Sequence, residues 1–85
     1  MLTRSVSRFL RETARDPEKR WTVIDSLVVD LAAFSSRHPG GARVLEGYVG
    51  RDATQAFYDG VLNRHSRAAR SLVDMLAIAR VVPDN

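Results

Sequence analysis

The side chains best suited to chemistry in this sequence are its two histidines, His38 and His65. His38 stands directly before Pro39 in the run His-Pro-Gly-Gly, and His65 stands directly before Ser66. Imidazole is a common metal ligand, and each histidine falls where we expect one helical piece to meet another. A lone histidine is more often a hydrogen-bonded surface residue than a ligand. The pair, however, could present one imidazole to each face of a flat apolar ligand.

Other site chemistries find less support in the sequence. A zinc site needs three or four ligands, whereas this chain has two histidines, scattered carboxylates and no cysteine. The sequence contains no Gly-x-Ser-x-Gly elbow of the hydrolases and no dinucleotide fingerprint. The His-Pro-Gly-Gly run is not a phosphate loop, because it lacks the lysine and the strand-to-helix context.

Length and composition predict one small domain. A chain of 85 residues buries only about 60% of its unfolded surface, so its core alone is marginal. Domains of this size often depend on disulfides, a metal or a cofactor, and disulfides are excluded here by the absence of cysteine.

The positive charge is concentrated at the N-terminus. The net charge is +3, and residues 1–20 hold six basic and three acidic side chains, whereas residues 21–85 hold seven of each. A basic body that wraps a nucleic acid is therefore not indicated, although a small basic nucleic-acid-binding domain stays an alternative.

The Arg- and Ser-rich start could be an organellar transit peptide, but Glu12 counts against that reading. The alternative is an ordinary first helix, with Ser7 as its N-cap and Phe9, Leu10 and Ala14 facing the core.

No apolar run approaches the roughly 18 residues of a membrane span, and no apolar tail precedes Asn85. We therefore expect a soluble protein or a module cut from a larger one. The expected location is cytoplasmic, or the cytosolic face of a membrane if the chain is part of a larger protein, with a mitochondrial location as the alternative.

The pattern of apolar and turn-forming residues predicts an α+β domain with several short helices in pairs. The strands are expected at Trp21–Ile24, Leu27–Val29 and the final Ala-Ile-Ala-Arg-Val-Val, with a tight hairpin or a sheet corner at Asp25-Ser26. The helical pieces are expected at Ala32–Arg37, at Ala42–Val49 after a break at Pro39-Gly40-Gly41, at Ala53–Tyr58 between Asp52 and Gly60, and at Arg67–Leu76 capped by Ser66.

Three motifs in order resemble a known family. They are Phe34-x-x-x-His38-Pro39-Gly40-Gly41, then Gly50-Arg51-Asp52-Ala53-Thr54-x-x-Phe57, then His65-Ser66. Together they resemble the cytochrome b5 haem-binding domain, and the match runs from about Val6 to Val82. The resemblance implies a cytochrome b5-like fold, in which a small mixed sheet and two helix-pair units enclose a haem pocket. Residues 1–85 would form one domain, with a basic helix and lead-in over 1–20 and the haem-binding body over 21–82.

The same resemblance implies the cofactor and its ligands. His38 and His65 would be the axial ligands of one non-covalent b-type haem, and a six-coordinate iron favours electron transfer over oxygen chemistry. Ser66 would hydrogen-bond a haem propionate, and Gly41 would allow positive φ and a close approach of the backbone to the haem edge. The apolar walls carried over from the family are Ile24, Leu31, Phe34, Val44, Leu45, Ala53, Phe57 and Leu72. Plain core is the alternative for each.

The implied function is that of a one-electron carrier rather than an enzyme. Its partners would be a reductase donor and an oxidoreductase acceptor such as a lipid desaturase or hydroxylase, and the protein is expected to be a monomer that binds no nucleic acid. A non-redox, steroid-type ligand-binding domain on the same fold is the alternative.

Two departures from the family pattern concern the pocket rim. The rim is basic, through Arg37, Arg43, Arg64 and Arg67, which could pair with the propionates, face an acidic partner or simply be solvated. The stretch before His65 is about three residues longer than in the microsomal type, as in desaturase-fused domains.

Overall fold

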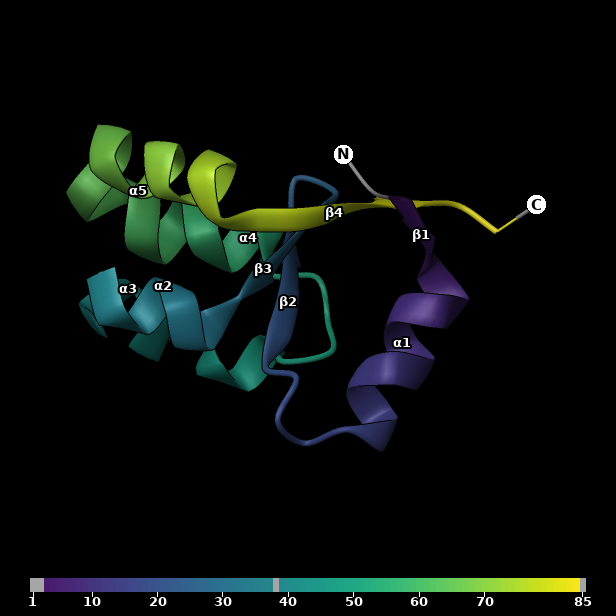
Figure 1. Ribbon diagram of the computed structural model, residues 1–85. Coiled ribbons are helices and arrows are strands. Elements are labelled where there is room, and N and C mark those ends of the chain that lie inside the picture. The colour runs from purple at the N-terminus through teal and green to yellow at the C-terminus, as the bar shows by residue number, and fades with distance from the viewer. Residues whose placement is uncertain (1–2, 38, 85) are drawn as a thin grey trace.

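The structure, a computed structural model, describes residues 3–37 and 39–84, and the side chains of residues 39, 41 and 61–69 lie outside that description. The described residues form a four-stranded sheet of order β1-β4-β3-β2, which runs through the middle of the molecule (Figure 1). Strand β4 is parallel to β1 and antiparallel to β3, which is in turn antiparallel to β2. The strands are β1 (Thr3–Ser5), β2 (Trp21–Ile24), β3 (Leu27–Asp30) and β4 (Ala77–Val82).

The β2–β3 hairpin is as the sequence predicted. Asp25 and Ser26 have φ of 51° and 64°, the left-handed values that a two-residue type I′ turn needs at both positions. Aspartate tolerates this conformation better than most residues. The register places Ile24 opposite Leu27, so the two strands present their alternate residues to the two faces of the sheet.

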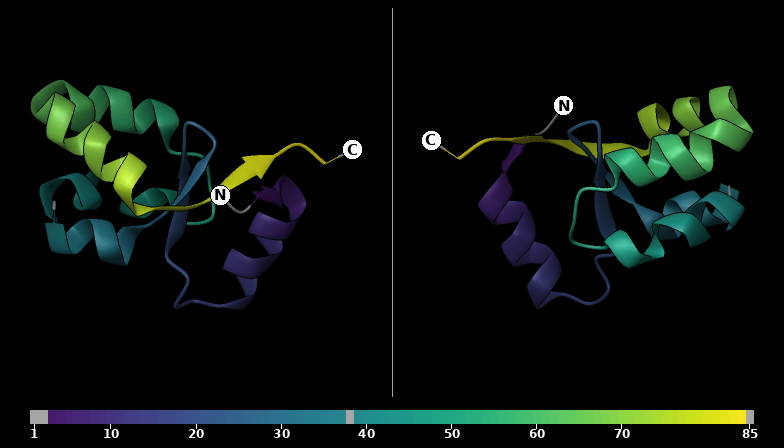
Figure 2. Two further views of the ribbon diagram at one scale, coloured as in Figure 1. Left: turned by 45° about the horizontal axis from the view of Figure 1, so that its top comes forward. Right: turned by 180° about the vertical axis from the view of Figure 1, so that it is seen from behind.

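Helices cover both faces of this sheet. Two helix pairs lie on one side, and α1 lies on the other (Figures 1 and 2). The first pair is α2 (Leu31–Arg37) with α3 (Pro39–Leu45), and the second is the π-helical η2 (Phe57–Leu62) with α5 (Asn63–Leu76). The remaining helical pieces are α1 (Val6–Arg15), the 3₁₀ turn η1 (Glu46–Tyr48) and α4 (Thr54–Ala56).

Each face of the sheet has its own apolar cluster. The cluster under the helix pairs contains Phe34, Leu45, Phe57 and Val73, all fully buried, and the cluster under α1 is built on Phe9. Phe9 therefore faces the core as predicted. The same prediction for Leu10 and Ala14 was wrong, since Leu10 is 48% exposed and Ala14 is also exposed. Successive residues point about 100° apart around a helix, so Leu10 turns away from the sheet and Ala14 follows it.

The N-cap of α1 is Ser5 rather than the predicted Ser7. The Ser5 hydroxyl accepts a hydrogen bond from the backbone N–H of Arg8 at 3.2 Å. Ser7 instead donates both its N–H (3.2 Å) and its hydroxyl to the Asp84 carboxylate. Pairing of β1 with β4 brings this carboxylate to the start of the helix, where the helix dipole favours a negative charge. The hydrogen bonds from Ser7 lower the pKa of Asp84.

The two predicted breaks within the helical region were also misplaced. Helix α3 begins at Pro39, a favoured first helical residue, so Gly40 lies in its first turn and has no positive φ. Among the described glycines, the one with a left-handed backbone is Gly50, with φ of 75°, in the turn that follows η1. Gly60 does not end a helix, because η2 continues through it into α5, and Ser66 consequently lies inside α5.

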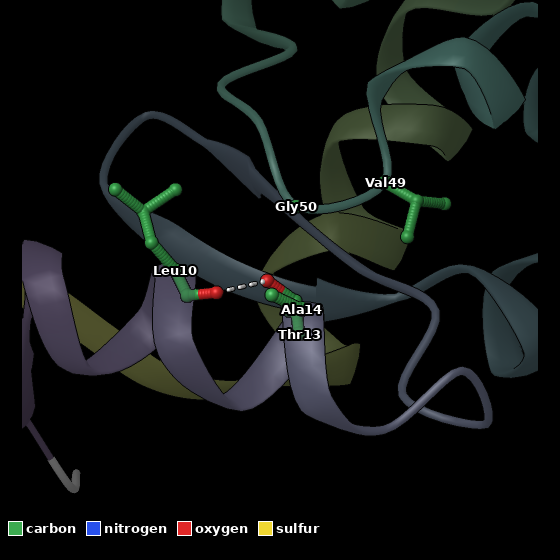
Figure 3. A pocket seen from close by; sticks show the side chains of 5 residues that line it. All are labelled: Leu10, Thr13, Ala14, Val49 and Gly50. Atoms are coloured by element: carbon green, nitrogen blue, oxygen red, sulfur yellow. Dashed lines mark hydrogen bonds between the residues drawn. The ribbon is translucent and has the colours of Figure 1, made fainter.

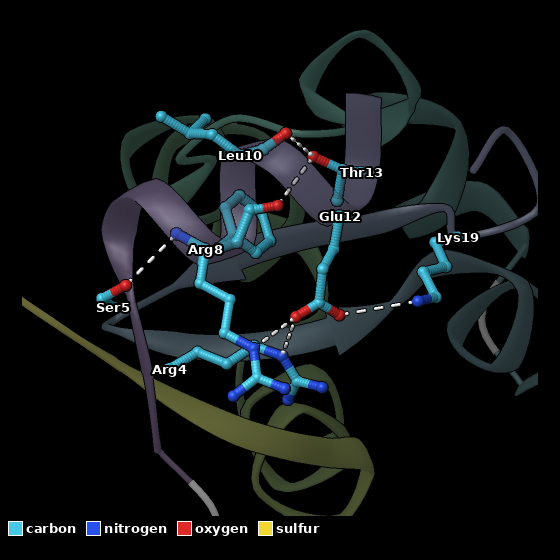
Figure 4. A network of polar contacts seen from close by, with 8 residues as sticks. Arg4, Ser5, Arg8, Leu10, Glu12, Thr13 and Lys19 are labelled. Carbon is cyan, nitrogen blue, oxygen red and sulfur yellow. Dashed lines mark hydrogen bonds and ion pairs between the residues drawn. The ribbon is translucent and has the colours of Figure 1, made fainter. Parts of the chain in front are cut away.

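A cluster of cations surrounds Glu12 and fixes the N-terminal segment to the sheet (Figure 4). The Glu12 carboxylate pairs with Arg4 (3.1 Å), Arg8 (2.8 Å) and Lys19 (3.5 Å). Arg4 and Lys19 also stack on the ring of Trp21, at 5.1 and 5.0 Å from its centroid. Hydrogen bonds from Arg4 first, and then from Arg8, lower the pKa of Glu12 from 4.5 to about 2, against the opposing effect of burial.

Replacing Glu12 with glutamine should therefore reduce the acid sensitivity of the fold. A folded-state pKa below the unfolded value means that the ionised carboxylate stabilises the protein above pH 4.5, and that this contribution is lost as the pH falls toward 2. The Glu12 side chain keeps 20% of its surface exposed, and water therefore screens its ion pairs in part. We expect the variant to lose only about 1 kcal/mol of unfolding free energy at pH 7. Urea unfolding followed by circular dichroism between pH 2 and 7 should show a flatter pH profile for the variant, and parallel profiles would contradict the prediction.

Candidate functional site

The two histidines belong to neighbouring helix pairs. His38 lies outside the described residues, between the end of α2 at Arg37 and the start of α3 at Pro39. His65 lies in the first turn of α5, and its side chain is outside the description. Helix α2 packs against α5, and α3 packs against η2, so the two helix pairs are in contact with each other (Figure 2).

The predicted pocket walls come together between these helix pairs. Phe34 on α2, Leu45 on α3 and Phe57 on η2 are completely buried in one cluster, and Leu72 on α5 joins them at 9% exposure. The same cluster also contains the other carried-over walls Ile24, Leu31 and Ala53. Both helix pairs thus contribute to a single apolar surface, which suits a flat apolar ligand and would also serve as plain core.

The remaining predicted pocket residues either lie outside the buried cluster or are described only by their backbone. Val44 on α3 is 43% exposed and lies outside the buried cluster. It borders η2, because a Cβ added at Gly60 would lie 2.9 Å from Val44 Cγ1. Gly41 lies within α3 and Ser66 within α5, and the Ser66 side chain is outside the description.

A loop that follows the edge of β2 positions the second motif. The N–H of Gly50 donates to Trp21 O at 2.7 Å, and the N–H of Ala53 donates to Val23 O at 2.7 Å. The Ala53 carbonyl then accepts from the N–H of Phe57 at 2.8 Å. In addition, the Asp52 carboxylate accepts from the N–H of Thr54 at 2.8 Å. This loop therefore fixes the point at which Phe57 enters the apolar cluster.

A polar contact behind the pocket was not anticipated from the sequence. The Asp25 carboxylate accepts hydrogen bonds from the Tyr58 hydroxyl and from the Arg70 guanidinium. The hydrogen bond that the Tyr58 hydroxyl donates to the Asp25 carboxylate is the main reason why the pKa of Asp25 is lowered, and the same bond raises the pKa of Tyr58. The three residues are far apart in the chain, and no local pattern links them.

The basic rim is described only in part. Arg37 and Arg43 are exposed, and Arg37 Nη1 lies 3.8 Å from the sulfur of Met75. The side chains of Arg64 and Arg67 are outside the description. The rim therefore stays a prediction.

The residues gathered between the helix pairs fit a haem. Among the described side chains, no group of three or more histidines or carboxylates is arranged to hold a metal ion. The chain has no cysteine for a thioether link, so a haem would be held without a covalent bond. The apolar cluster supplied by both helix pairs suits the apolar macrocycle of a haem.

A surface groove on the α1 side is separate from this site (Figure 3). It has a volume of about 370 Å³ and lies between α1 and the Val49–Gly50 turn. The α1 wall of the groove is formed by Leu10, Thr13 and Ala14. The Thr13 hydroxyl donates hydrogen bonds to backbone carbonyls of its own helix. The groove thus offers no metal-ligating side chain.

None of the helices in the described part of the chain has the length and apolar character of a membrane span.

Comparisons with known proteins bear directly on the family. The family model described as cytochrome b5-like heme/steroid binding domain matches residues 6–82. Cytochrome b5 of Musca domestica is 34% identical over 87 aligned residues, which cover 99% of this chain and 63% of that protein. Cytochrome b5 type B of Rattus norvegicus is 40% identical over 68 residues, which cover 80% of this chain and 44% of that protein.

A third relative is much longer than this chain. Acyl-CoA desaturase 1 of Saccharomyces cerevisiae is 38% identical over 61 residues, which cover 72% of this chain but only 12% of the desaturase. The chain thus spans less than two thirds of each of these relatives. It belongs to the cytochrome b5-like haem/steroid-binding family, and membership in this family confirms the predicted cofactor, a non-covalently bound b-type haem.

Proposed function

We propose that this domain is a one-electron carrier in which His38 and His65 are the two axial ligands of the haem iron. The observation that carries the proposal is the placement of the two histidine-bearing segments on helix pairs that share one buried apolar cluster. The family match over residues 6–82 supports it.

In this function the histidines, the apolar walls and the helix pairs would each have a separate role. When bound, the haem would supply one-electron chemistry, and two histidine ligands on its iron would leave no position for oxygen. The two imidazoles would hold the iron in both oxidation states. Phe34, Leu45 and Phe57 would exclude water from the macrocycle, and burial of this kind is one determinant of the reduction potential. The helix pairs, fixed on the sheet, would keep the two ligands in place when the charge changes.

The proposed partners are a reductase that donates the electron and an oxidoreductase that accepts it. The desaturase relative supports an acceptor of the lipid desaturase or hydroxylase class. We further propose that the domain works as a monomer, on the cytoplasmic side of the cell, as a donor to such an enzyme or as a module of it. As an electron carrier, the domain would leave the catalytic step to its partner.

The optical spectrum of the haem-loaded protein tests the proposal. One equivalent of haem should give a low-spin, bis-imidazole spectrum in the oxidised form and again after reduction with dithionite. Failure to take up haem, or a high-spin spectrum in both states, would contradict the proposal. Binding of a steroid in place of haem would instead support a ligand-binding role, which the family description also includes.

A further inference from the structure

Asp25 stands at the tip of the β2–β3 hairpin and contacts three helical elements. Its backbone N–H donates to Thr54 Oγ1 on α4 at 2.9 Å. Its carboxylate accepts from the Tyr58 hydroxyl on η2 and from Arg70 Nη1 on α5. Arg70 Nη1 also lies 3.0 Å from the Tyr58 hydroxyl oxygen, so Asp25, Tyr58 and Arg70 form a closed triangle, here called the Asp25 latch.

The helical members of the latch bracket His65. Tyr58 lies near the start of η2 and Arg70 lies in the middle of α5, so the segment between them carries the histidine. Each latch residue is also close in sequence to a pocket wall. Tyr58 follows Phe57 and meets its ring edge-to-face at 5.6 Å, and Asp25 follows the buried Ile24.

This segment needs an anchor from outside itself. Six residues of η2 are π-helical, a conformation that is rare and is found mostly at functional sites. The helix alone does not fix where such a segment lies relative to the sheet. The hairpin does supply a fixed point, because Asp25 is held in a left-handed turn between two paired strands.

The chemistry of the latch favours positioning over bulk stability. Its bonds are charge-assisted, and such bonds are stronger and more directional than neutral ones. The Asp25 and Arg70 side chains are 30% and 37% exposed, however, so water screens part of the attraction between them. The latch thus orients η2 and α5 on the hairpin more than it stabilises the domain.

We propose that the Asp25 latch is a positioning device that holds the His65 segment where it can ligate the haem iron. This inference rests on the proposed function, since its consequence is seen in the ligation and retention of haem. Without the latch, the hairpin would no longer hold η2 and α5 through polar bonds, and the contacts of the apolar cluster alone would set their position relative to α2 and α3.

Two conservative variants test the latch. Tyr58→Phe removes only the hydroxyl, and Asp25→Asn removes only the charge. The matched control is Asp74→Asn, which removes the other carboxylate partner of Arg70, at 3.4 Å within α5, without touching the hairpin. Each protein is loaded with haem. The rate of haem transfer to an excess of apomyoglobin is then measured, together with the low-spin fraction of the ferric spectrum.

Both latch variants should lose haem roughly tenfold faster than the parent, which corresponds to about 1.4 kcal/mol, and should show a partly high-spin spectrum. The control should stay within about twofold of the parent in rate and should keep its low-spin spectrum. Should Asp25→Asn fail to fold, Tyr58→Phe decides the question alone.

The outcomes separate this inference from the function on which it rests. If the parent protein takes up haem with a low-spin spectrum and the latch variants match the control, the latch is wrong and the proposed function stands. The latch is also wrong if haem loss accelerates while the low-spin fraction is unchanged, because that result describes general loosening. If the parent takes up no haem, both are overturned.

Discussion

Alanine in place of His65 should abolish the low-spin spectrum and weaken haem binding by more than about 100-fold. Loss of a partner that merely orients a metal-bound histidine costs 10- to 100-fold in affinity, so loss of the ligand itself should cost more. His38→Ala should have the same effect, because the sequence contains no third histidine to replace either one. Haem titration followed by optical spectroscopy measures both quantities.

Two controls make this prediction sharp. Free imidazole added to the His65→Ala protein should restore a low-spin spectrum, since it can occupy the vacated position. Met75→Ala should leave the spectrum unchanged, although Met75 is exposed on the same helix and a methionine sulfur can ligate haem iron. Normal haem binding by either histidine variant would contradict the assignment of that histidine as a ligand of the haem iron.

Alanine in place of Phe57 should be among the most damaging changes at the pocket walls. The side chain is completely buried in the cluster shared by both helix pairs, and a change from Phe to Ala in a core typically costs about 3–5 kcal/mol. Native proteins have only about 5–15 kcal/mol of stability in total, so the change should remove a large fraction of the stability of the haem-free protein. Urea unfolding of the haem-free protein, followed by circular dichroism, measures the loss.

Phe9→Ala is the matched control, because Phe9 is equally buried but lies in the cluster under α1. It should lower the stability of the haem-free protein to a similar degree. If Phe57 is a pocket wall, haem should stabilise the Phe9 variant well and the Phe57 variant poorly. Equal rescue of both by haem would show that Phe57 serves only as core.

Local chemistry explains which parts of the fold could be predicted. The hairpin was predicted because short runs of β-branched and apolar residues flank Asp25-Ser26, a pair that suits a tight turn. Strand β1 was missed, because three residues carry no pattern and its partner β4 lies at the far end of the chain. The same long-range pairing explains the wrong cap of α1, since the Asp84 carboxylate occupies Ser7.

The family motifs supplied the residues of the candidate site. The motifs around His38 and His65 have fixed spacing, and the resemblance assigns Phe34, Leu45 and Phe57 as walls; the structure gathers these three in one buried cluster, and their role toward haem stays a prediction. Sequence patterns did not reveal that η2 continues into α5, because Gly60 normally signals a break. Nor did they reveal the Asp25 latch, whose members meet only once the sheet and the helices are packed.

The position of β1 at the edge of the sheet has a consequence for synthesis. Thr3 pairs with Arg80, and Phe9 packs with Ala79, so β1 has no strand partner until β4 has left the ribosome. Contacts that close such long loops form slowly, whereas the β2–β3 hairpin closes locally. The pairing of the basic N-terminal segment with the sheet is therefore completed late, after the hairpin has formed.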